Sequence, residues 1–168
     1  MRDLEYILQL CKLYQAKLEE FTSNYPSGSC YISAYFLSNY LKDRYDARIV
    51  FGNLAIISKL GKYVVYGSIK LKKDINVGDY HAWCELTING REYIVDPSIK
   101  YNIKFLKDNY RLKVSQKVPE IIITDQKSTF NFKYIENTVF KKYADPFIKQ
   151  IPQSLLDSLT EELDGVTF

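Results

Sequence analysis

Apolar residues recur at helical spacing along the first twenty residues of the chain, with charged residues between them. The stripe consists of Leu4, Ile7, Leu8, Cys11, Tyr14 and Leu18. Such spacing predicts an amphipathic helix over residues 3–22, with Cys11 as a small core residue on its apolar side. Residues 22–29 crowd serine, asparagine, proline and glycine together, which is typical of a loop.

A second helix is expected to begin directly after this loop. Ser29 can serve as its N-cap, and the sequence CYISAYFLSNYLKDRY that follows places large apolar residues at near-helical spacing. Apolar residues surround much of this helix, which indicates that it is buried.

The middle of the chain changes to patterns that favour strands. ARIVFGNLAIIS and KYVVYGSIKL are rich in β-branched and aromatic residues, and Lys59-Leu60-Gly61 between them predicts a turn. Two more strands are expected within residues 78–98, and VPEIIIT adds one over residues 118–124. From residue 138 onward the pattern predicts two short helices, divided by Pro146 and Pro152. Helices, then antiparallel strands, then helices indicate the α+β class.

The segment GDYHAWCELTINGREYIVDPS contains the only histidine and the only tryptophan of the chain. Its Asn89-Gly90 pair is a strong signal for a two-residue hairpin turn, because both central residues of a type I′ turn need positive φ. In that register Trp83 faces Asp96 and His81 faces Ser98. Alternation then places His81, Trp83, Glu85, Ile94, Asp96 and Ser98 on one face. Cys84 falls on the opposite face, with the apolar residues that we expect to form the core.

His81 and Asp96 are diagonal cross-strand neighbours in this register, close enough for a hydrogen bond between imidazole and carboxylate. A three-residue loop would instead move Asp96 to the other face, so the inference depends on turn length. Asp79 and Glu85 are alternative partners on the same face. We prefer Asp96 because VDPS ends the strand and leaves the carboxylate near the rim of the sheet.

Composition narrows the class of protein. A chain of 168 residues is long enough to bury a core as one domain, residues 1–168. Net charge is +3, and the lysines are scattered, so we expect no nucleic-acid partner. No apolar run approaches the roughly 20 residues of a membrane span, and charged residues interrupt the start where a signal peptide would be apolar, so we expect no membrane partner. Three irregularly spaced cysteines suit a reducing cytoplasm and match no zinc pattern, and we expect neither metal nor cofactor.

A histidine held by a carboxylate can serve as a base for a nucleophile. Cys30 is the candidate nucleophile, because it follows a Gly-Ser turn at the first position of the second helix. Backbone N–H groups and the helix dipole at such a position favour a thiolate. The N–H of Cys30 would give one oxyanion donor, and the side chain of Asn24 is a candidate for the second, with Tyr25 and Tyr31 as further candidates.

These residues together resemble the transglutaminase-like superfamily, which belongs with the papain-like thiol enzymes. GSCYISAYFLSNYLKDRYDARIVFG is similar to the cysteine helix and first core strand of that family, and HAWCEL and GREYIVDPS to its His and Asp strands. The resemblance covers residues 28–98 and implies that Cys30 is the nucleophile, His81 the base and then acid, and Asp96 the orienting residue. Trp83 would pack near the site. Asn24 parallels a glutamine that stands six residues before the cysteine in the papain branch.

The resemblance implies a thiol enzyme that acts on the amide bonds of a peptide or protein substrate, as a peptidase or a glutamine deamidase. An acyltransferase that forms amide bonds and a binding module without turnover are the alternatives. Residues 99–168 lie outside the resemblance and either cover the cleft or bind the substrate. No acidic calcium loop is present, so activation by calcium is not expected. The oligomeric state is left open.

Overall fold

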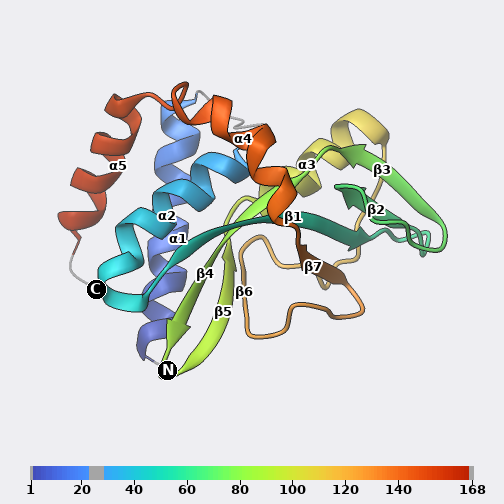
Figure 1. The fold of residues 1–168 in the computed structure, drawn as a ribbon, viewed down its shortest axis with the longest axis horizontal. Helices are drawn as coiled ribbons and strands as arrows, with labels where there is room; N and C mark the ends of the chain where they lie inside the picture. The colour runs from blue at the N-terminus through green and yellow to red at the C-terminus, as the bar shows by residue number, and fades with distance from the viewer. Residues whose placement is uncertain (1, 23–28, 167–168) are drawn as a thin grey trace.

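A mixed β-sheet of seven strands runs through the molecule, and helices pack against it (Figure 1). The computed structural model describes residues 2–22 and 29–166. The helices are α1 (Arg2–Phe21), α2 (Cys30–Tyr45), α3 (Ile99–Tyr110), η1 (Thr138–Phe140), α4 (Lys141–Ile148) and α5 (Gln153–Asp164). The strands are β1 (Arg48–Ile57), β2 (Tyr63–Tyr66), β3 (Asp74–Gly78), β4 (His81–Ile88), β5 (Arg91–Asp96), β6 (Ile122–Thr124) and β7 (Phe132–Glu136). This arrangement confirms the α+β class.

The strand order is β3-β2-β1-β4-β5-β6, and β7 pairs with β1 outside this series. The first half of β1 pairs with β4 and its second half with β7. Gly52 stands where these two partners meet, opposite both His81 and Glu136. A Cβ atom at Gly52 would collide with the Ile135 carbonyl oxygen and the Trp83 ring, so the close approach of the three strands requires glycine.

Both faces of the β4–β5 hairpin are buried. Helices α1, α2 and α5 cover one face, where their apolar residues enclose Cys84, Leu86 and Val95. This is the core face that alternation predicts. Trp83 and Ile94 point to the other face and pack against α3, β6 and β7. Of this second layer the sequence predicted only the strand within residues 118–124, where β6 lies. The layer encloses the polar residues that share the face.

The predicted helices α1 and α2 are present, as are the β1–β2 pair and the hairpin. Asn89 and Gly90 have φ of 50° and 76°, as the type I′ turn requires. The pairing of Cys84 with Val95 follows the predicted register. Ser29 does stand at the N-cap of α2, but its side chain makes no capping hydrogen bond.

Several expectations were wrong. The sheet is not wholly antiparallel, because β3 runs parallel to β2. Strand β2 ends at Tyr66, well before the end of the predicted segment. Pro146 lies inside α4 and does not divide the C-terminal helices, whereas Pro152 is the N-cap of α5. Helix α3 and strands β3 and β7 were not predicted.

Candidate active site

Cys30 and His81 line one cavity of about 280 Å³. Cys30 is the first residue of α2 and His81 the first residue of β4, and α2 packs across this strand. The thiol of Cys30 is partly exposed, whereas the imidazole of His81 is fully buried. The fold therefore brings together two residues that lie about fifty positions apart in the sequence.

Asp96 holds His81 by the hydrogen bond that the hairpin register predicts. His81 Nε2 and Asp96 Oδ2 are 2.7 Å apart, and neither side chain is more than 1% exposed. Tyr134 also donates to Oδ2, at 2.7 Å. The other oxygen, Oδ1, accepts from the backbone N–H of Ser98 at 2.9 Å and from its hydroxyl at 2.6 Å. Four donors thus fix the orientation of the carboxylate.

Charge and burial act in opposite directions on this pair. Burial disfavours the imidazolium form of His81. The Asp96 carboxylate, and to a smaller extent the Cys30 sulfur, favour it, and the net result is that the pKa of His81 is raised from 6.5 to about 10. Burial also opposes ionisation of Asp96. The pKa of Asp96 is nevertheless lowered, because His81 carries the opposite charge and the carboxylate accepts hydrogen bonds from His81, Ser98 and Tyr134. Both shifts favour the ion pair of imidazolium and carboxylate.

The second nitrogen of His81 is left for the nucleophile. Nδ1 is buried and has no hydrogen-bond partner among the described residues, and the same holds for the hydroxyl of Ser29, next to Cys30. Cys30 still acts electrostatically on His81. Asp96 occupies Nε2, so only Nδ1 can exchange a proton with a group in the cavity.

The alternative partners of His81 lie elsewhere. Glu85 is 3% exposed and accepts from Arg48 at 2.6 Å and from the Trp83 indole at 3.2 Å. Asp79 is exposed at the edge of the cavity and makes no hydrogen bond to His81. The choice of Asp96 over these two acids as the partner of His81 is confirmed.

Trp83 packs beside the pair. Its ring stacks on His81 with centroids 6.2 Å apart and meets Tyr134 edge-on at 5.1 Å. Tyr31 does not line the cavity with Cys30; its ring stacks on Phe51. Asn24 and Tyr25 lie outside the described residues.

The other two cysteines are enclosed in the core between the helices and the sheet. Cys11 and Cys84 have no exposed surface, and burial raises the pKa of both thiols. Their expected role as inert core residues agrees with this placement.

Residues 99–168 contribute to the site in two ways. Helix α3 forms one wall of the cavity through Tyr101, Asn102 and Phe105. Strand β7 carries Tyr134. Burial, and then the neighbouring Asp96, raise the pKa of this tyrosine well above 10.0. These residues were not predicted from the sequence, because the resemblance to the transglutaminase-like superfamily ends at Ser98. The alternation of FKYIE was the one signal for a strand at this position.

No group of three or more metal-binding side chains occurs among residues 2–22 and 29–166. Over the same residues, no helix has both the length and the apolar character needed to cross a bilayer.

The His81–Asp96 pair is expected to stabilise the fold most between pH 3.8 and 6.5. Because folding raises the pKa of His81 from 6.5 to about 10, the histidine contributes its full stabilisation at pH values below 6.5, and this contribution is lost as pH rises through about 10. Because folding lowers the pKa of Asp96 below 3.8, the aspartate contributes its full stabilisation at pH values above 3.8, and this contribution is lost as pH falls below that value. The measurement is the difference in Tm between the protein and His81→Gln from pH 3 to pH 10. A difference that does not change with pH would contradict the paired charges.

No protein-family model matches the chain, and no curated protein matches it. One solved structure, a crystal structure described only by a genomics designation, is similar in fold. It superposes with a TM-score of 0.54 at 12% sequence identity, covering 95% of this chain and 77% of the other. At that identity the likeness concerns the fold alone, and it agrees with the α+β class.

Proposed function

We propose that the protein is a thiol enzyme that acts on amide bonds through an acyl-enzyme on Cys30. The observation that carries the proposal is the shared cavity, in which Cys30 meets a buried histidine held by a carboxylate at 2.7 Å. Nucleophile, base and orienting acid in this order are the arrangement used for covalent catalysis of acyl transfer.

In the proposed reaction, the Cys30 sulfur bonds to the carbonyl carbon of the substrate, and the proton of the thiol resides on Nδ1 of His81. Collapse of the tetrahedral intermediate breaks the C–N bond, and His81 gives this proton to the leaving amine. Water then attacks the thioester, with His81 taking its proton and returning it to the sulfur as the acid leaves. Asp96 stays ionised throughout and stabilises the imidazolium.

Two features of the described residues support this assignment. Nδ1 has no hydrogen-bond partner among residues 2–22 and 29–166, so a proton of the thiol or the substrate can occupy it. Cys30 is the first residue of α2, and the first backbone N–H groups of a helix have no acceptor within it, so they can serve an oxyanion formed at this residue. The resemblance of residues 28–98 to the transglutaminase-like superfamily, with its papain-like core, belongs to the same proposal.

Alkylation of the native protein tests the proposal. At pH 6 iodoacetamide is expected to modify Cys30 at least about tenfold faster than it modifies glutathione, because His81 in the same cavity can take the thiol proton. Mass spectrometry of peptides assigns the modified cysteine, and Cys11 and Cys84 serve as internal controls because both are buried. A rate at Cys30 equal to that of glutathione would argue for a binding module without turnover.

A further inference from the structure

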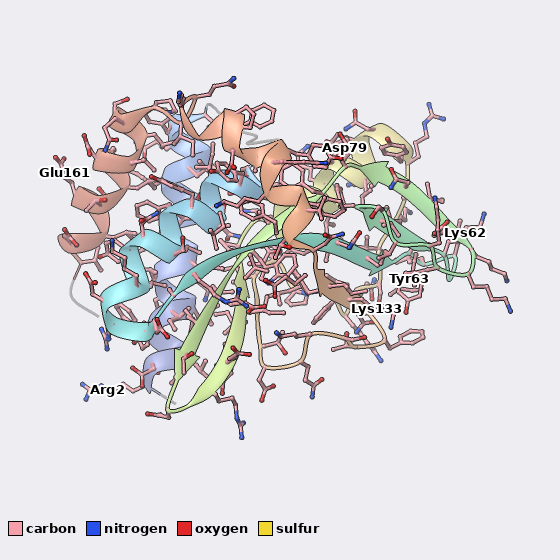
Figure 2. All side chains as sticks on the ribbon, in the orientation of Figure 1. Arg2, Lys62, Tyr63, Asp79, Lys133 and Glu161 are labelled. Carbon is pink, nitrogen blue, oxygen red and sulfur yellow. The ribbon has the colours of Figure 1, made fainter. Side chains whose placement is uncertain are left out.

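The cavity beside Cys30 has an apolar wall and a single acidic side chain at its edge. Tyr66, Val77, Tyr101 and Phe105 form the wall, from β2, β3 and α3. Asp79 lies at the edge, in the short link between β3 and β4, where Figure 2 labels it. Its side chain is exposed, and no described lysine or arginine forms an ion pair with it. The side chain of Asp79 therefore has no cationic partner among the described residues.

The described part of the cavity contains no lysine or arginine. Among the described lining residues His81 is the one that can carry a positive charge, and it is paired with Asp96. Apart from the oxyanion position at the N-terminus of α2, the described lining offers no unpaired cationic side chain to a carboxylate or a phosphate of a substrate, whereas Asp79 would repel either group.

The size of the cavity limits the group that enters it. Pockets for small ligands hold roughly 300–1,000 Å³, and this cavity of about 280 Å³ lies just below that range. One large side chain fits such a space. Aromatic rings bind an alkyl stem by apolar contact and can bind a cation through their faces.

Resting on the proposed function, we infer that this cavity selects a substrate group with a positive charge on an apolar stem, as in lysine or arginine of a peptide. The stem lies against the aromatic wall, and the cation meets Asp79 at the entrance. Asp79 is a specificity residue in this assignment and takes no part in bond breaking.

Charged thiol reagents of matched size test the inference. Aminoethyl, hydroxyethyl and sulfonatoethyl methanethiosulfonate carry charges of about +1, 0 and −1 and form a disulfide with Cys30. The readout is the ratio of the Cys30 modification rates for the cationic and anionic reagents. Asp79→Asn is expected to lower this ratio about tenfold at low salt, because one unit charge a few ångströms away favours the cation and disfavours the anion by similar factors. At about 1 M salt the difference should largely disappear.

Asp43→Asn is the matched control. It removes the same charge from an exposed position on α2, about 20 Å along the helix from Cys30, and should change the ratio less than about twofold. The charge of His81 affects both proteins equally, so the comparison isolates Asp79. An unchanged ratio in Asp79→Asn, with fast modification by the neutral reagent, overturns the inference and leaves the proposed function intact. Slow modification by all three reagents overturns both.

Protection experiments identify the source of the cation. N-acetyl-lysine amide, n-butylamine and N-acetyl-norleucine amide are each added before iodoacetamide, and the rate of Cys30 modification is measured. Stronger protection by the lysine amide than by the other two supports a peptide side chain. Equal protection by butylamine assigns the cavity to a free amine, and equal protection by the uncharged norleucine amide overturns the inference.

Discussion

His81→Ala is expected to slow the alkylation of Cys30 by iodoacetamide at pH 6 by about 100-fold. An ordinary cysteine thiol, with a pKa near 8.5, holds well under about 1% thiolate at this pH. His81 shares the cavity with the sulfur and is the group there that can take the thiol proton. Removing the ring removes that proton acceptor. The measurement is the second-order rate constant from peptide mass spectrometry between pH 5 and pH 9, where the rate of the variant should rise with the pH profile of a simple thiol.

Unfolding provides the control for this experiment. In concentrated urea the cavity is lost, and Cys30 should react at the same rate in the protein and in His81→Ala. His81→Asn, which retains a polar side chain of smaller size, gives a second variant if the alanine form folds poorly. Equal native rates in the protein and in both variants, with both folded by circular dichroism, would remove His81 from the proposed mechanism.

The two-residue turn of the hairpin explains why the His81–Asp96 pair could be predicted from the sequence. Asn89 and Gly90 determine the turn, the turn determines the register, and the register determines that His81 and Asp96 share a face. These are local steps within twenty-one residues, so no tertiary information is needed. The position of Cys30 could be inferred because its loop and helix signals are also local.

The enclosure of the site was not predictable in the same way. The polar face of the hairpin is buried because α3, β6 and β7 return to it from residues 99–136. Strand β3 is short and rich in polar residues, DINVG, and it gains its strand conformation from parallel pairing with β2. Tyr134 reaches Asp96 only through the pairing of β7 with β1. Such contacts depend on tertiary packing, which overrides weak local patterns.

The same enclosure should make the loss of the Asp96 side chain costly. Asp96→Ala is expected to lower the free energy of unfolding by about 3–5 kcal/mol, because removing one partner of a buried ion pair leaves an uncompensated charge. The hydroxyls of Ser98 and Tyr134 lose their acceptor as well. Urea unfolding monitored by circular dichroism measures the loss.

Two milder variants separate charge from hydrogen bonding. Tyr134→Phe removes one of the donors to Asp96 and should cost about 1.5–3 kcal/mol, the range for a single hydrogen bond to a charged group. Asp96→Asn keeps the shape of the side chain and removes its charge. Because the chain has one histidine, an NMR titration reports the pKa of His81 directly. This pKa should lie near 10 in the protein. It should fall in Asp96→Asn, because burial, which lowers the pKa of His81, is then opposed by Cys30 alone. A pKa that stays near 10 in that variant would show that Asp96 does not hold the proton on His81, and the orienting role would then pass to another group.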